Sequence, residues 1–198
     1  MSGSVVDETL SSLKGAWLLF RQNEDGYRLF NVSVTGFWRS FGVFFIILPI
    51  YLFSLYVEGR MMEVVRPEMA AEADVGPGML VIAALGLEWI AFPVLMVFLA
   101  RLMKLGAFYV PYIIAYNWSA AIISMMLIPA LVLFLFGLLG PSAAMGINFG
   151  VSFFMLYYRW FIARTSLKVS GSTAAALVAI DFLLSMVIGV AATNLSQG

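Results

Sequence analysis

Two carboxylates, Glu88 and Asp181, lie within long apolar stretches, where an acidic side chain could bind and release protons or cations. A carboxylate deep in a membrane is unfavourable, so such residues usually face the interior of a helix bundle or water. With Asn117 and Asn148 as further polar side chains, the two acids could line a path for protons or cations. The structural alternative is that one acid is neutral and hydrogen-bonded, while Asp181 pairs with Arg159 and holds two helices together. A third possibility is an interface with another subunit.

The residue types that most enzymes use are absent. The chain has no cysteine and no histidine, which excludes thiolate nucleophiles, Cys-ligated metals, His-ligated haem and the usual zinc sites. No phosphate-binding loop, H-E-x-x-H or G-x-S-x-G sequence occurs. Asp181 is the only aspartate within a span, whereas a paired-aspartate protease needs two. We therefore expect no catalytic residue, no metal and no cofactor.

Composition places these residues in a membrane. The 198 residues are 63% hydrophobic and 11% charged, with a mean hydropathy of +0.99. Soluble domains carry about 25% charged and about 45–50% apolar residues. The net charge is zero, so nothing attracts nucleic acid. The predicted fold class is an all-α polytopic transmembrane helical bundle, with the lipid bilayer as its first partner.

Five spans fit the apolar stretches, because a helix needs roughly 20 apolar residues to cross a bilayer. The third is long and contains Pro129, which predicts a kink or a tilt. Together they form a transmembrane domain over 37–198. The expected spans lie at about 40–57, 79–100, 108–139, 142–163 and 173–193.

Residues 1–36 form a polar N-terminal segment. Asp7–Phe20 is predicted to be an amphipathic helix with Asp7 as its N-cap. Its apolar stripe would lie in the membrane interface or dock on the cytoplasmic face of the protein. The stripe consists of Leu10, Leu13, Trp17 and Phe20.

Nine of the cations fall on one side of the membrane, as the positive-inside rule requires, if the number of spans is five. Arg60 and Arg66 fall on the other side, in the acidic loop Glu58–Gly76. This predicts a multi-pass protein, such as one of a bacterial inner membrane, with a cytoplasmic N-terminus and an external C-terminus. The cytoplasmic cations are Lys14, Arg21, Arg28, Arg39, Arg101, Lys104, Arg159, Arg164 and Lys168.

Two further patterns concern packing. Small residues at intervals of four let transmembrane helices approach closely, which predicts that the fourth and fifth spans pack together. Aromatic residues near the cytoplasmic boundary predict an interfacial belt, with a pocket for a lipid tail or a quinone-like ring as the alternative. The small residues are Ser142, Gly146 and Gly150, facing Ser185, Gly189 and Thr193. The aromatic residues are Tyr109, Tyr112, Tyr116, Trp118, Tyr157, Tyr158 and Trp160.

The layout resembles the Yip (Ypt-interacting protein) family and its bacterial relatives, whose members have a cytoplasmic segment and five close spans. Ser33–Trp38 is similar to the family's Gly-Pro-Phe-Trp approach to the membrane but lacks the proline, and Ala115–Asn117 is similar to its Gly-Tyr-Ser segment. The resemblance implies a role like that of the eukaryotic members, which work in vesicle traffic with small GTPases, and it transfers no functional residue.

The function expected from these patterns is that of a membrane scaffold or an accessory subunit of a membrane complex, in contact with other membrane proteins or with copies of itself. The alternative is a small proton- or cation-coupled transporter or channel that uses Glu88 and Asp181.

Overall fold

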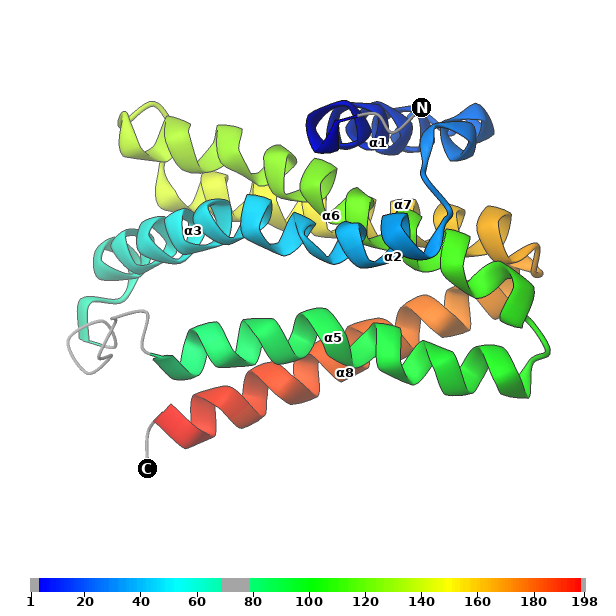
Figure 1. Cartoon of the computed structure of the whole chain (residues 1–198). Helices are drawn as coiled ribbons and strands as arrows, with labels where there is room; N and C mark the ends of the chain where they lie inside the picture. The colour runs from blue at the N-terminus through cyan, green and yellow to red at the C-terminus, as the bar shows by residue number, and fades with distance from the viewer. Residues whose placement is uncertain (1–3, 69–78, 197–198) are drawn as a thin grey trace.

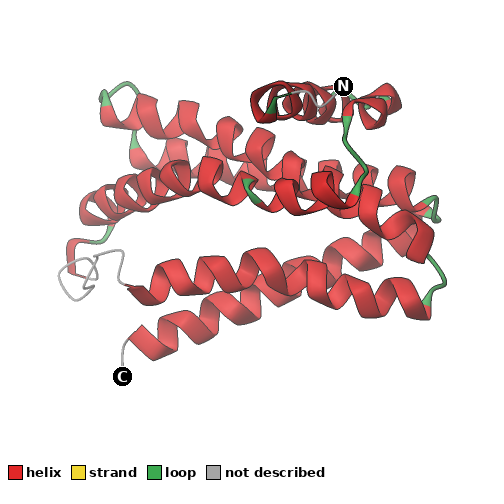
Figure 2. Ribbon diagram, in the orientation of Figure 1, coloured by secondary structure: helices red, strands yellow, loops and turns green. Residues whose placement is uncertain are grey.

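The described residues, 4–68 and 79–196 of this computed structural model, form helices joined by short turns, with no strand among them (Figures 1 and 2). This confirms the all-α prediction. The helices are α1 (Val5–Phe20), the short 3₁₀ helix η1 (Glu24–Leu29), α2 (Val34–Phe41), α3 (Val43–Val65), α5 (Met79–Leu102), α6 (Gly106–Leu135), α7 (Pro141–Leu167) and α8 (Gly171–Ser196).

Four segments are long and apolar enough to cross a membrane, as in a multi-pass membrane protein. They are Val34–Val65, Val81–Leu102, Gly106–Leu135 and Gly171–Asn194. The remaining long helix, α7, has 27 residues but is less apolar than these four, since it carries Asn148, Arg159 and Arg164.

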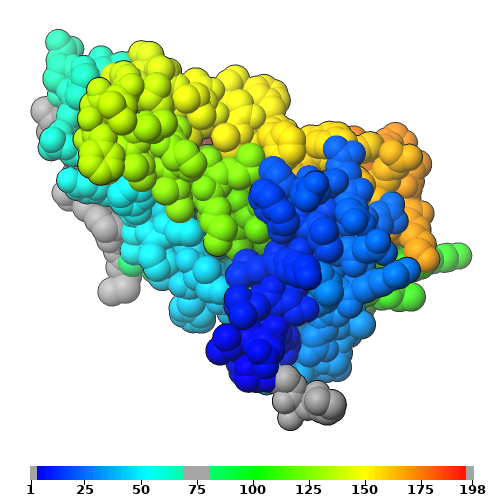
Figure 3. Space-filling view, turned by 90° about the horizontal axis from the view of Figure 1, so that it is seen from above, coloured from blue at the N-terminus to red at the C-terminus, as the bar shows by residue number. Residues whose placement is uncertain are grey.

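The helices form two layers with α6 at the centre. α3, α6 and α7 lie together, α5 and α8 lie beneath them, and α1 crosses over α6 and α7 (Figures 1 and 3). Residues 112–123 of α6 are buried without a break. A helix that is apolar all round can be buried on every side, and α6 therefore takes the middle position.

The N-terminal segment folds back on itself before it meets the bundle. Ser4 caps α1, and Asp7 lies in the third helical position and completes the capping box, so the prediction that Asp7 is the N-cap was wrong. A Cβ atom on Gly26 would come within 2.4 Å of the Gly15 carbonyl oxygen, a distance that only glycine permits. This close backbone contact joins η1 to α1.

The buried residues of α1 are Ser12, Gly15, Ala16 and Leu19. Ala16 and Leu19 belong to the core of the bundle, whereas Gly15 lies against η1 and Phe30. Of the predicted apolar stripe, Leu13 and Phe20 pack against the core. Leu10 and Trp17 remain exposed. The docked face therefore lies beside the stripe that the sequence pattern picks out.

The first span is longer than predicted. α3 continues to Val65 because Val57 and Met61 pack against Leu131 of α6 and Ala144 of α7. The first residues of the expected loop Glu58–Gly76 are therefore helical, and its residues 69–78 lie outside the described part of the chain.

The third span also ends differently. α6 runs through Pro129 without a break and stops at Leu135, four residues before the predicted end at 139. The chain then turns at Gly137, whose φ of +70° suits glycine, and α7 begins at Pro141.

The predicted contact between small residues of α7 and α8 is wrong. Cβ atoms added to Gly146, Gly150 or Gly189 would meet nothing within 4 Å, and Ser142 is exposed while Ser185 is half-buried. α7 and α8 are joined near the turn between them, whereas farther along α8 runs beside α5 in the lower layer (Figure 1). α7 and α8 therefore pack together as predicted, but not through these small residues.

Candidate functional site

A buried ion pair joins α7 to α8 through Arg159 and Asp181. The Arg159 Nη1 group donates to Asp181 Oδ2, and the two side chains are 15% and 6% exposed. The sequence-based pairing of these residues is confirmed. A buried charge that loses its partner is strongly unfavourable, so this pair holds the two helices in one arrangement.

Tyr116 of α6 completes the site. Its hydroxyl accepts a hydrogen bond from Arg159 Nη1 at 2.6 Å and donates one to Asp181 Oδ1 at 2.8 Å. The Arg159 guanidinium carbon also lies 4.3 Å from the centre of the Tyr116 ring, in cation–π contact. The three residues, here called the triad, therefore link α6, α7 and α8.

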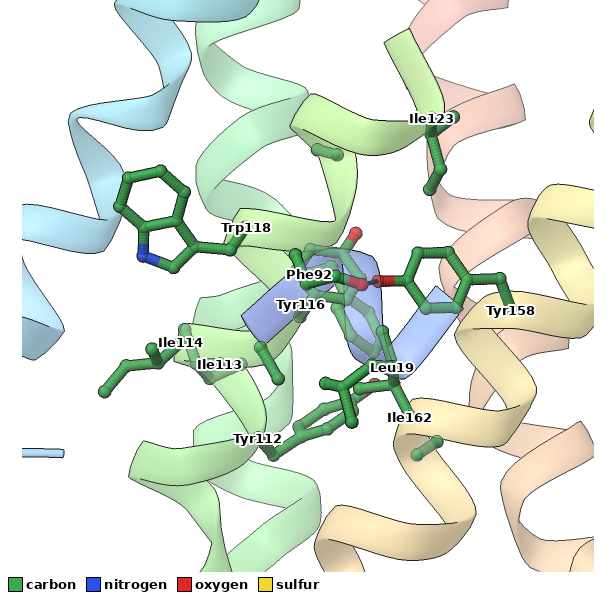
Figure 4. Packing of buried hydrophobic residues seen from close by; sticks show 14 of the residues in the cluster. Leu19, Phe92, Tyr112, Ile113, Ile114, Tyr116, Trp118, Ile123, Tyr158 and Ile162 are labelled. Atoms are coloured by element: carbon green, nitrogen blue, oxygen red, sulfur yellow. Dashed lines mark hydrogen bonds between the residues drawn. The ribbon is translucent and has the colours of Figure 1, made fainter. Parts of the chain in front are cut away.

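Aromatic and aliphatic side chains surround the triad. The ring of Phe92 lies 5.0 Å from that of Tyr116, between centroids. Figure 4 shows Phe92, Tyr112, Tyr116 and Tyr158 gathered near Leu19 and Ile162. All six are at most 7% exposed. In such surroundings the ion pair is weakly screened. Arg159 Nε is buried and has no hydrogen-bond partner among the described residues.

Asn117, the next residue on α6, belongs to a different contact. It is fully buried, and its Nδ2 donates to Ser40 Oγ of α2 at 2.9 Å, while Ser40 donates to the Phe37 carbonyl at 2.7 Å. The Asn117 Oδ1 atom has no partner among the described residues. Asn117 thus attaches α2 to α6 and lies outside the triad.

Glu88 and Asn148 do not join the triad either. Glu88 is half-buried on α5 and forms no hydrogen bond or ion pair with any residue that the structure describes. The side-chain oxygen of Asn148, on α7, is buried and has no hydrogen-bond partner among the described residues. Of the five polar candidates from the sequence, the structure therefore brings together only Arg159 and Asp181.

Two tyrosines hold the N-terminal segment against α7. The Tyr158 hydroxyl donates to the Ala16 carbonyl at 2.6 Å. The Tyr27 hydroxyl donates to the Ile162 carbonyl at 3.2 Å and lies 2.7 Å from the Thr165 hydroxyl. Burial raises the pKa of the Tyr27 phenol well above its usual range, so it stays a proton donor.

The prediction of an aromatic belt was wrong for most of its members. Tyr112, Tyr116, Trp118 and Tyr158 are at most 7% exposed and lie in the core. Tyr157 is 41% exposed, and Trp160 is half-buried. A tyrosine near a span boundary gives the same sequence pattern whether it faces lipid or a neighbouring helix, so the sequence could not identify Tyr116 as part of the triad.

Neither of two hollows on the described surface contains an acid of the expected ion path. One of about 330 Å³ lies between the start of α2 and the start of α6, and the other, of about 390 Å³, lies between α7 and α8. Within the described ranges, no three acidic side chains are grouped so that they could hold a metal ion.

No family model, no curated protein and no solved structure matches the chain. The resemblance to the Yip family therefore rests on the sequence features alone.

Proposed function

We propose that this protein is a membrane scaffold or accessory subunit without catalysis of its own. The observation that carries the proposal is the triad, in which Asp181 is paired with Arg159 and Tyr116 amid apolar side chains. A carboxylate held in this way serves helix assembly, whereas a proton or cation path needs its acids accessible to water.

The proposed topology has five spans, with α7 as the fourth. α7 packs against both α6 and α8, and its one deep cation is neutralised by Asp181. Five alternating helices would place the C-terminus on the side opposite the cytoplasmic N-terminus. The positive-inside rule supports this orientation, because Arg101, Lys104, Arg164 and Lys168 all flank helix ends on one side.

Two surfaces could receive partner proteins in this role. α1 presents exposed Leu10 and Trp17 on the side away from its docked residues. The end of α3 presents Glu58, Arg60 and Glu63, where Arg60 pairs with Glu63 at 3.1 Å. One surface lies at the proposed cytoplasmic end and the other at the opposite end.

Glu88 favours a second candidate, a proton- or cation-coupled transporter or channel. It is half-buried in a helix long enough to span a membrane and has no partner among the described residues. An unpaired acid at this depth is a candidate for binding a proton or a cation. Asp181 would be a structural residue in that case.

Reconstitution separates the two functions. The purified full chain in liposomes is tested for proton, sodium and potassium flux beside Glu88→Gln, with Ser152→Ala as a matched exposed control. The scaffold proposal predicts no flux and co-purification of the chain, in fixed ratio, with other membrane subunits or with copies of itself. Flux that Glu88→Gln abolishes and Ser152→Ala preserves would overturn it.

A further inference from the structure

The hollow between α7 and α8 has an apolar lining along both helices. It is lined by Leu156, Tyr157, Trp160, Ala175, Val178, Ala179 and Phe182, and its volume is about 390 Å³. Small Ala175 and Ala179 on α8 leave the space, while aromatic side chains of α7 form the opposite wall. An extended hydrocarbon chain is the type of ligand that such a lining accepts.

Trp160 forms a fixed wall of the hollow. Its indole Nε1 donates to the Gly171 carbonyl at 2.9 Å, which ties the ring to the first residue of α8. Tyr157 stacks on it with 5.6 Å between ring centroids and 26° between planes. The aromatic wall is therefore held in place by the protein itself, before any ligand binds.

A cation lies near one end of the hollow. The Arg164 guanidinium carbon lies 5.3 Å from the Trp160 ring centre, one helical turn beyond that lining residue. Arg164 is exposed and forms no ion pair with a carboxylate of the described residues. The N-terminus of α8 begins at Gly171, which contacts the same Trp160 ring, and adds a partial positive charge. An anion at this end would meet Arg164 and the helix terminus together.

The geometry points to a binding site for one anionic phospholipid, with an acyl chain in the α7–α8 hollow and the headgroup phosphate on Arg164. The hollow runs along the helices from Phe182 and Leu156 toward the turn at 168–170, and Arg164 lies beyond Trp160 toward that end. This matches a lipid of the surrounding leaflet, whose chain follows the helices and whose charge lies at the surface. The inference does not depend on the scaffold role.

Native mass spectrometry of the detergent-solubilised full chain tests the site. The probes are dioleoylphosphatidylglycerol and dioleoylphosphatidylcholine, and we expect one retained phosphatidylglycerol in preference to phosphatidylcholine. Arg164→Gln should lower phosphatidylglycerol binding by about fivefold, since one cation near the headgroups contributes on the order of 1 kcal/mol. Ala179→Leu, which fills the hollow, should also lower it. The matched control Arg101→Gln removes an exposed cation at the end of α5 and should leave it unchanged.

Several results would overturn the inference. Equal losses in Arg164→Gln and Arg101→Gln would indicate general attraction of anionic lipid to the surface. Unchanged binding in Ala179→Leu would show that no chain enters the hollow. Displacement of the lipid by an equal concentration of glycerol 3-phosphate would mean that only the phosphate is recognised. A polypeptide retained in place of the lipid would make the hollow a protein interface.

Discussion

Tyr158 of α7 donates a hydrogen bond to the backbone carbonyl of Ala16, 142 positions earlier in the chain. The two residues are 2% and 0% exposed, so this hydrogen bond lies inside the protein, near the C-terminal end of α1. The contact makes α1 part of the bundle and gives the first prediction.

Tyr158→Phe should loosen α1 without unfolding the bundle. It removes the Tyr158 hydrogen bond to the Ala16 carbonyl, which still accepts its helical hydrogen bond within α1, so the loss should be about 0.5–1.5 kcal/mol. Hydrogen exchange of α1 amides should become faster while α6 amides are unaffected. Tyr157→Phe is the control, because Tyr157 is exposed and no hydrogen bond of its hydroxyl is found in the described residues. Equal exchange in both variants would contradict the proposed attachment.

The triad gives the second prediction. Arg159→Gln and Asp181→Asn should each destabilise the folded protein by about 3–5 kcal/mol, because each leaves one buried charge unpaired. The double variant should recover more than half of that loss, since it removes both charges. The measurement is detergent-induced unfolding followed by circular dichroism, with Ser152→Ala as the control. Additive losses would show that the two side chains do not stabilise each other.

The third prediction concerns Ser40. Ser40→Ala removes the partner of the buried Asn117 amide, whose oxygen is already unpaired. We expect a loss of about 1–3 kcal/mol. The double variant Ser40→Ala with Asn117→Leu should regain part of it, because no buried polar group then remains at this contact. The same unfolding measurement applies, and a neutral Ser40→Ala would mean that the Asn117 amide is satisfied in another way.

Glycines that look alike in the sequence should respond differently to alanine. Gly26→Ala places a Cβ atom 2.4 Å from the Gly15 carbonyl oxygen, so η1 must move away from α1. Gly146→Ala meets nothing within 4 Å and, at an exposed helical position, should be neutral or stabilising by about 1 kcal/mol. Limited proteolysis of the N-terminal segment should be faster only in Gly26→Ala. Equal rates in the two variants would contradict this arrangement.

The sequence was sufficient to predict the all-α membrane fold and one contact of the site, the pairing of Arg159 with Asp181. Uniform apolarity over long stretches identifies membrane helices, and Asp181 has one cation, Arg159, at a similar depth in a neighbouring span, which leaves few ways for it to pair. Periodicity could not show the buried face of α6, since that helix is apolar on all sides. It therefore could not show that Tyr116 faces inward, or that Asn117 meets Ser40 from a distant segment.

The small-residue patterns failed for a related reason. A row of small residues such as Ser142, Gly146 and Gly150 shows that another helix could approach this face closely. It does not show whether one does, because the position of α8 depends on its packing against α5 as well as α7. The N-terminal glycines, by contrast, carry no helix-packing spacing, although Gly15 and Gly26 are in close contact.

The docking of α1 on α7 also sets an order of events on the ribosome. The surface that receives Ala16 includes Tyr158, so α1 has left the exit tunnel long before its acceptor is synthesised. At roughly 5–20 residues per second, the intervening 142 residues take roughly 7–28 s to translate. For that period α1 lacks its hydrogen bond to α7, and until α6, its other neighbour, is also made, its docking face is open to targeting factors or chaperones.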